Sequence, residues 1–233
     1  MKNKIISVIV NVVLCLVITA TIVVGFVGGG AETVSSDREN LYYRSPSPRG
    51  VSLMFNVYEN TDNVMKILDI LDEYGAKATF FVGGCWADDN VDCLREIASR
   101  GHEVGSHGYF HRDHDKLSYA QNVEEISVSV KLIDAILDTQ TALFAPPSGA
   151  FSDATLSASE SLGLKTIMWS RDTIDWRDGD VDLIVKRATE NLENGEFILM
   201  HPKDVTVKAL PQILNNVRQS GYSAVTVSYN LGE

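Results

Sequence analysis

The sequence predicts an α/β fold, a distorted (β/α)7 barrel preceded by one N-terminal transmembrane helix. After Val51, short apolar segments alternate with amphipathic helical segments, which is the pattern of a parallel sheet. Each of five helical segments ends at a glycine that precedes an apolar segment, as expected for a left-handed helix C-cap. These glycines are Gly75, Gly101, Gly163, Gly195 and Gly221. A long apolar run before the domain predicts the membrane helix.

The strands follow from the apolar segments. We expect seven: Val51–Asn56, Ala78–Val82, His102–Ser106, Ala142–Ala145, Thr166–Ser170, Phe197–Met200 and Ser223–Val227. Among the helices, Val64, Leu68 and Leu71 form one apolar face, and Ser118 with Gln121 forms a capping box that opens the longest helix, Ser118–Leu137. Seven units in about 180 residues suit a small or incomplete barrel. An open doubly wound sheet is the alternative, although the sequence has no Gly-rich phosphate loop.

The N-terminal run, Ile5–Val27, has 23 residues without a charge and is long enough to cross a bilayer. Lys2 and Lys4 precede it, so the N-terminus is expected in the cytoplasm and the remainder outside. We therefore divide the chain into a cytoplasmic tip and signal-anchor helix (1–31), an extracytoplasmic linker (32–50) and a domain (51–233). A cleaved signal peptide is the alternative, because residues 28–31 are small; the protein would then be secreted.

The charge and the cysteine content of the chain limit the classes of partner and the state of the thiols that we expect. Lys2 and Lys4 are the only charged residues before Glu32, so the remaining 18 basic and 31 acidic residues give a net charge of −13. Such an acidic segment argues against nucleic acid and anionic lipid as partners. Cys85 and Cys93 are compatible with a disulfide outside the cytoplasm, and equally with two separate thiols.

Polar residues gather where the predicted strands end, which is where a β/α barrel carries its chemistry. His107 follows the third strand, PPSG (residues 146–149) the fourth, RDTIDW (residues 171–176) the fifth and His201 the sixth. His107 and His111 are four residues apart and can hold one metal ion. A catalytic zinc usually has three protein ligands, so we look for a third among Glu59, Asp62 and His114.

From Val51 to Leu231 the sequence resembles the polysaccharide deacetylases of the NodB-homology type, carbohydrate esterase family 4. The segments that carry the resemblance are ILDILDEYGAKATFFVGG, RGHEVGSHGYFH, APPSGAFSD, MWSRDTIDW and ILMHP, in the order of that family. The resemblance implies a distorted β/α barrel. It also implies a divalent metal, often zinc, that activates water against the N-acetyl group of an amino sugar.

The resemblance also implies residue roles. His107 and His111 match the metal-binding histidines, and His201 matches the acid that protonates the leaving amine. An aspartate of the D-x-x-D-W motif would tune His201; Asp172 is the first choice and Asp175 the second. Ser148, which follows Pro147, takes the place that supplies a backbone N–H to the oxyanion. Pro147 and Trp176 would contact the sugar.

The first motif departs from the family, which has T-F-D-D-G-P where this chain has MFNVYE. Asn56 stands in place of the general base and Val57 in place of the metal ligand, and neither side chain can take that role. The arginine that contacts the base is Ala145 here. Either another residue completes a rewired site, or hydrolysis has been lost.

We therefore expect a membrane-anchored, extracytoplasmic hydrolase that removes N-acetyl groups from cell-wall glycan such as peptidoglycan, with a divalent metal as cofactor. The alternative is a catalytically impaired homologue that acts as an envelope glycan-binding or scaffold protein. A role in sporulation, as in some family members with altered first motifs, is an intermediate possibility.

Overall fold

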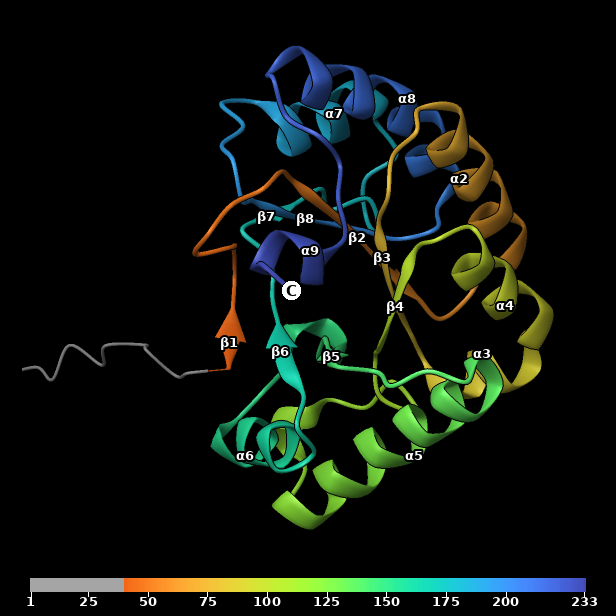
Figure 1. Cartoon of the computed structure of the whole chain (residues 1–233), viewed down its shortest axis with the longest axis vertical. Coiled ribbons are helices and arrows are strands. Elements are labelled where there is room, and N and C mark those ends of the chain that lie inside the picture. Colours follow the sequence, from red (N-terminus) through yellow and green to blue (C-terminus); the bar gives the residue numbers. More distant parts are fainter. Residues whose placement is uncertain (1–39) are drawn as a thin grey trace, which may run out of the picture. The chain divides into compact units, whose positions relative to one another are not determined.

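In residues 40–233, eight short strands form one curled sheet in which all neighbouring strands run parallel (Figure 1). The structure is a computed structural model and describes residues 40–233. The sheet order is β1-β6-β5-β4-β3-β2-β8-β7. The strands are β1 (Leu41–Tyr42), β2 (Ser52–Val57), β3 (Thr79–Val82), β4 (Glu103–Ser106), β5 (Leu143–Phe144), β6 (Lys165–Ile167), β7 (Arg171–Asp172) and β8 (Phe197–Met200). Within these residues no ladder joins β1 to β7, so the curl is an open half-barrel.

Most helices cover the outer face of the curl (Figure 1). The helices are α2 (Thr61–Glu73), α3 (Gly84–Asp89), α4 (Val91–Ser99), α5 (Tyr119–Leu137), α6 (Asp153–Ser161), α7 (Val181–Thr189), α8 (Asp204–Gln219) and α9 (Val227–Leu231). Two 3-10 turns, η1 (His114–Lys116) and η2 (Pro147–Gly149), lie in loops that follow β4 and β5. The predicted face of Val64, Leu68 and Leu71 is buried on α2, and the capping box of Ser118 and Gln121 opens α5 as predicted.

The alternation of side chains along β2 sorts its residues between two apolar clusters. Leu53, Phe55 and Val57 belong to the large cluster under the outer helices, where Phe55 stacks on Phe80 of β3 with ring centroids 5.0 Å apart. Met54 belongs to the smaller cluster inside the curl. Asn56 is two residues further along that inner face, at the carboxyl end of the strand.

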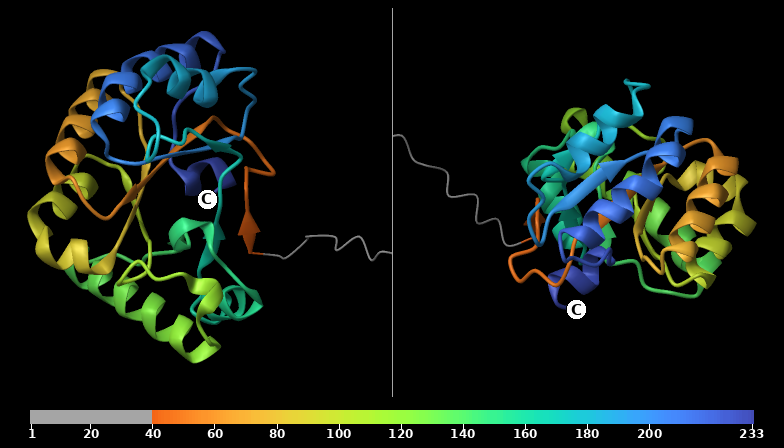
Figure 2. Two further views of the ribbon diagram at one scale, coloured as in Figure 1. Left: turned by 180° about the vertical axis from the view of Figure 1, so that it is seen from behind. Right: turned by 90° about the horizontal axis from the view of Figure 1, so that it is seen from above.

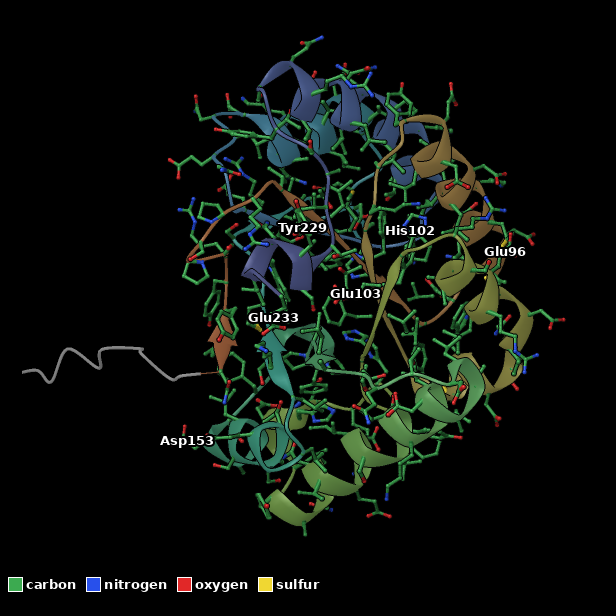
Figure 3. The ribbon with its side chains drawn as sticks, in the orientation of Figure 1. Glu96, His102, Glu103, Asp153, Tyr229 and Glu233 are labelled. Atoms are coloured by element: carbon green, nitrogen blue, oxygen red, sulfur yellow. The ribbon has the colours of Figure 1, made fainter. Side chains whose placement is uncertain are left out.

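Helix α9 fills the opposite end of the curl, where the strands begin, and two views show it inside the sheet (Figures 1 and 2). Val227 packs with Met54, Phe81 and Phe197 in the inner cluster. The backbone N–H of Ser228 donates to Glu103 at the start of β4 (3.2 Å). Figure 3 labels Glu103 and Tyr229 in this region.

The observed sheet differs from the predicted one at three places. Ser223–Val227 forms no strand: Ala224 makes a single bridge to Val51, and Thr226 then caps α9 through the N–H of Tyr229. The expected linker 32–50 is in part sheet, because β1 pairs with β6. Strand β7 was not predicted. Residues 40–50 thus belong to the same compact unit as residues 51–233.

Four of the five glycine predictions are confirmed: Gly75, Gly101, Gly163 and Gly221 directly follow a helix C-cap and have φ between 61° and 81°. The prediction for Gly195 was wrong, because α7 ends at Thr189 and Gly195 (φ 87°) lies in the turn before β8. The cysteines are separate thiols: Cys85 lies 3.0 Å from the Tyr58 hydroxyl and Cys93 lies 3.8 Å from the Met65 sulfur. The expected anchor (1–31) and the first part of the linker lie outside the described residues. Within residues 40–233, no helix has the length and apolar character needed to span a membrane.

Candidate functional site

A cleft of about 250 Å³ opens at the carboxyl ends of β2, β4 and β8. It is lined by Asn56, Tyr58, Glu59, His107, His111, His201 and Pro202. The sheet brings these residues together because β3 alone separates β2 from β4, and β8 lies on the other side of β2. The structure therefore gathers both histidines of the H-x-x-x-H motif, His201 and the altered first motif at one place.

His201 and Asp175 form a tightly bonded pair at one side of the cleft. The Asp175 carboxylate accepts from the His201 Nδ1 (2.8 Å) and from the His201 backbone N–H (2.7 Å). The Thr206 hydroxyl donates to the same carboxylate at 2.5 Å. The Asp175 side chain is fully buried, so these donors replace its hydration. With Nδ1 engaged, the Nε2 of His201 is the ring nitrogen left for a ligand.

The preference for Asp172 as the partner of His201 is corrected by this geometry. Asp172 accepts from the backbone N–H of Ile174 (2.8 Å) and supports the turn. Ile174 has φ 57°, a left-handed conformation that is strained for a β-branched residue. This turn presents Asp175 to His201. Arg177, two residues further along the chain, is exposed.

Helix α7 holds the turn that carries Asp175. Arg187 of α7 donates to the Thr173 carbonyl (3.0 Å) and pairs with Asp178 (2.7 Å). The Asp178 carboxylate also accepts from the Arg177 Nε (2.8 Å). These guanidinium groups hold the pKa of Asp178 well below its usual range. The loop is thus fixed at Thr173 and at Asp178, on both sides of Asp175.

His107 is oriented from behind. It is buried, and its Nδ1 lies 2.7 Å from the Ala145 carbonyl, so the Nδ1–H tautomer donates there and leaves Nε2 unprotonated. Burial, and secondarily His111, lowers the pKa of His107 to about 3. The imidazole is therefore neutral at physiological pH, which is the form that binds metal ions.

His111 is more exposed and stands between two rings. Its centroid lies 5.1 Å from that of His107 and 4.9 Å from that of Tyr58. Its backbone has φ 55°, and burial lowers its pKa. Two neutral imidazoles thus meet edge to face in the cleft.

The three candidates for a third metal ligand do not join this pair. His114 is fully buried, and its Nδ1 lies 2.6 Å from the Asn122 Oδ1. Glu59 forms an ion pair with Lys203. Asp62 lies on α2 and lines a different hollow with Lys66 and Asp204. Among residues 40–233 no three His, Cys, Asp or Glu side chains form a group able to hold a metal ion.

The altered first motif explains this shortage of ligands. Val57 is fully buried in the outer apolar cluster and has no donor atom. Asn56 is 5% exposed and lines the cleft, and its Oδ1 has no hydrogen-bond partner. Since a catalytic zinc usually takes three protein ligands, the residues present do not fit the family's metal site.

The remaining predicted residues lie in loops beyond β5 and β7. Ser148 is exposed on the turn η2 with φ 56°, and Pro147 beside it is buried. Trp176 is 54% exposed, one residue after Asp175.

Sequence reasoning missed four residues near the site: Tyr58, Thr206, Lys203 and Phe110. Tyr58 packs against one side of the His111 ring, and its hydroxyl accepts a hydrogen bond from the Cys85 thiol. This hydrogen bond and burial raise the pKa of Tyr58 to about 12. Thr206 and Lys203 follow His201 within five residues, so their closeness in sequence was the available signal. In the sequence Phe110 lies between His107 and His111, and its side chain is 61% exposed.

Comparison with known proteins identifies the family that shares this architecture. The family model for polysaccharide deacetylase matches residues 43–167. The chain is 33% identical to YlxY, an uncharacterized protein of Bacillus subtilis, over 84% of this chain and 61% of that protein. It is also 33% identical to a peptidoglycan-N-acetylglucosamine deacetylase of Bacillus cereus, over 70% of this chain and 79% of that protein. The chain thus spans less than two thirds of YlxY.

Among solved structures, the chain resembles BA3943 of Bacillus anthracis, described as a pseudoenzyme of family CE4. The TM-score is 0.80 at 31% identity, and the match covers 83% of this chain and 69% of that one. A BA3943 mutant with restored enzymatic activity matches with the same TM-score at 30% identity. Both deacetylases and pseudoenzymes are therefore similar to this chain, which belongs to the polysaccharide deacetylase family.

Proposed function

We propose that the protein binds N-acetylated cell-wall glycan, such as peptidoglycan, in this cleft, and that hydrolysis of the acetyl group is lost or strongly weakened. The observation that carries the proposal is the state of Asn56 and Val57. An amide cannot act as the general base, and a valine buried among apolar side chains cannot complete a metal shell. The sequence alone favoured an active hydrolase; the geometry of this strand end favours the alternative.

Binding is supported by what remains in the cleft. The unpaired Oδ1 of Asn56 is a neutral acceptor, and burying it without a partner is unfavourable. An acetamido N–H is a suitable donor for it. The Nε2 of His201 and the exposed ring of Trp176 offer a polar and an apolar contact to a sugar. The strained turn at Ile174 also persists, and strain of this kind is characteristic of functional sites.

A second candidate function is metal-dependent N-deacetylation, the activity expected from the family. The observation that favours it is the intact pair of His201 and Asp175 beside His107 and His111. Because the described residues provide no third metal ligand, this function requires Glu59 to leave Lys203 or a further group to enter the cleft as a ligand. We place either activity outside the cytoplasm, with the N-terminal segment as an anchor, or in the secreted form if that segment is cleaved.

Calorimetry and acetate release on the same samples separate these functions. The purified protein is titrated with N-acetylated peptidoglycan fragments, with added zinc and with a chelator, and acetate is then measured. Binding that is insensitive to the chelator, without acetate above that of a His107→Ala/His111→Ala variant, supports the proposal. Zinc-dependent acetate release that the variant lacks supports the second candidate. The absence of binding and of turnover contradicts both.

A further inference from the structure

We infer that Phe110 is a second sugar-stacking platform, which together with Trp176 makes the cleft specific for an extended oligosaccharide rather than for a single sugar. The inference rests on the proposed glycan binding and adds a residue and a ligand length to it. It depends on the exposure of two rings, on the rigidity of their backbones and on their places along the sheet.

Phe110 and Trp176 are the most exposed of the large apolar side chains in residues 40–233, at 61% and 54%. Both follow the carboxyl end of a strand, Phe110 after β4 and Trp176 after β7. An exposed phenylalanine ring contributes little to folding. Phe110 directly precedes His111, which lines the cleft, and an exposed ring at this position is explained if it packs against a ligand in the bound state.

The backbone of Phe110 is held in place. Its N–H donates to the carboxylate of Glu125 on α5 (2.6 Å), and Glu125 is 5% exposed. The Phe110 ring meets the Tyr109 ring edge to face, with centroids 4.6 Å apart. The Tyr109 carbonyl in turn accepts from the backbone N–H of Cys85 (3.1 Å). The ring is therefore presented to solvent by a fixed support, which lowers the entropy lost on binding.

Trp176 has a comparable support. The N–H groups of Arg177 and Asp178 donate to the Ile174 carbonyl (3.1 and 3.0 Å), which closes a tight turn around it. The Arg177 guanidinium lies 5.7 Å from the centroid of the Trp176 ring. Both exposed rings thus stand on rigid loops, and this distinguishes them from mobile surface side chains.

The order of strands places the cleft between the two rings. From β4 the sheet continues through β3, β2 and β8 to β7, and the cleft is lined from the ends of β4, β2 and β8. At a strand spacing of about 4.8 Å, four steps correspond to at most about 19 Å along the sheet, and the curl shortens this distance. Because the cleft is lined from strand ends that lie between the two loops, a chain of sugars that passes through the cleft can reach both rings.

A glycan fits these rings better than a charged ligand does. Sugar rings have C–H faces that pack on aromatic rings, while their hydroxyl and acetamido groups can bond the polar cleft between. Within this cleft the carboxylate of Glu59 is paired with Lys203, and that of Asp175 is fully buried beneath His201. A cationic partner therefore finds no free carboxylate among the residues that line the cleft.

Calorimetry with β-1,4-linked N-acetylglucosamine oligomers of two and six sugars tests the inference. The full-length chain is compared with Phe110→Ala, Trp176→Ala and Phe110→Tyr variants. Tyr229→Ala is the matched control, because Tyr229 is 51% exposed and lies on α9 at the opposite end of the sheet. Circular dichroism melting shows whether each variant is folded.

We expect the six-sugar oligomer to bind more tightly than the two-sugar one. Phe110→Ala should weaken binding of the longer oligomer about three- to tenfold and leave the shorter one within about twofold, while Phe110→Tyr and Tyr229→Ala bind as the unmodified chain does. Equal affinity for both oligomers, or a Phe110→Ala variant that binds the longer one normally, would overturn the inference. If the unmodified chain binds neither oligomer, the proposed function itself fails.

Discussion

Asp175 receives two hydrogen bonds from a single residue, His201, one from the ring at 2.8 Å and one from the backbone at 2.7 Å. The two bonds fix both the ring and the chain segment that carries it. Thr206, in the first turn of α8, supplies a third donor. This arrangement joins β8, α8 and the loop after β7 at one buried carboxylate.

We predict that Asp175→Ala destabilises the protein by about 2–4 kcal/mol, because it leaves buried donors without an acceptor. Asp172→Ala is the matched control: it removes one hydrogen bond, to Ile174 N–H, and should cost about 0.5–1.5 kcal/mol. Urea unfolding at neutral pH measures both. Equal losses in the two variants would show that Asp175 does not hold the larger network.

His102 should make the protein acid-sensitive, and Figure 3 shows its position. It is 6% exposed, and its Nδ1 accepts from the Ala78 N–H (3.3 Å). Burial lowers its pKa to about 4, while an unfolded histidine has a pKa of about 6.5. Between about pH 4 and pH 6.5 the unfolded chain binds a proton on this histidine that the folded chain does not bind, which favours unfolding. The stability that neutral His102 allows is therefore complete above about pH 6.5 and is lost as the pH falls toward about 4.

Urea midpoints at pH 7 and pH 5 test this expectation. His102→Asn keeps an acceptor near the Nδ1 position and removes the titration, so its loss of stability between these pH values should be smaller by about 1–2 kcal/mol. The residual loss reflects the lowered pKa values of His107 and His114. An unchanged loss in His102→Asn would contradict the role of His102.

Gly108→Ala should disturb the loop that carries both histidines. Gly108 has φ 71°, and a Cβ there would lie 2.9 Å from the His114 Nε2 and 3.7 Å from Pro147. We expect a loss of stability of about 1–3 kcal/mol together with weaker glycan binding. Gly179→Ala is the control, because a Cβ there meets open space. Thermal melting should leave the control unchanged; a Gly108→Ala variant as stable as the control would contradict the geometry.

Much of the fold was predictable because it follows local rules. Glycine at a helix C-cap has few substitutes, so Gly75 and Gly221 mark helix ends reliably. The strands β1 and β7 have two residues each, which is too short for an alternation of apolar and polar residues to be visible in the sequence. The segment at Ser223 has the composition of a strand but is drawn into the start of α9, because Val227 completes the core inside the curl.

The candidate site was predictable in its residue types and less so in its contacts. The spacing of His107 and His111 and the position of His201 after a strand were sufficient to bring them together. Spacing could not choose between Asp172 and Asp175, since the left-handed backbone of Ile174 decides which carboxylate reaches His201. Nor could it show that Val57 points into the outer core, or that Lys203 engages Glu59.

Acetate release from N-acetylated glycan, measured with added zinc for the unmodified chain and for an Asn56→Asp/Val57→Asp variant, tests the central claim most directly. The two aspartates restore the residue types of the family's first motif, and the aspartate at position 57 reaches the cleft by leaving the outer apolar cluster in which Val57 is buried. We predict no release from the unmodified chain above that of His107→Ala/His111→Ala, and zinc-dependent release from the aspartate variant. Zinc-dependent release from the unmodified chain, above that background, would contradict the claim that the altered first motif has removed hydrolysis.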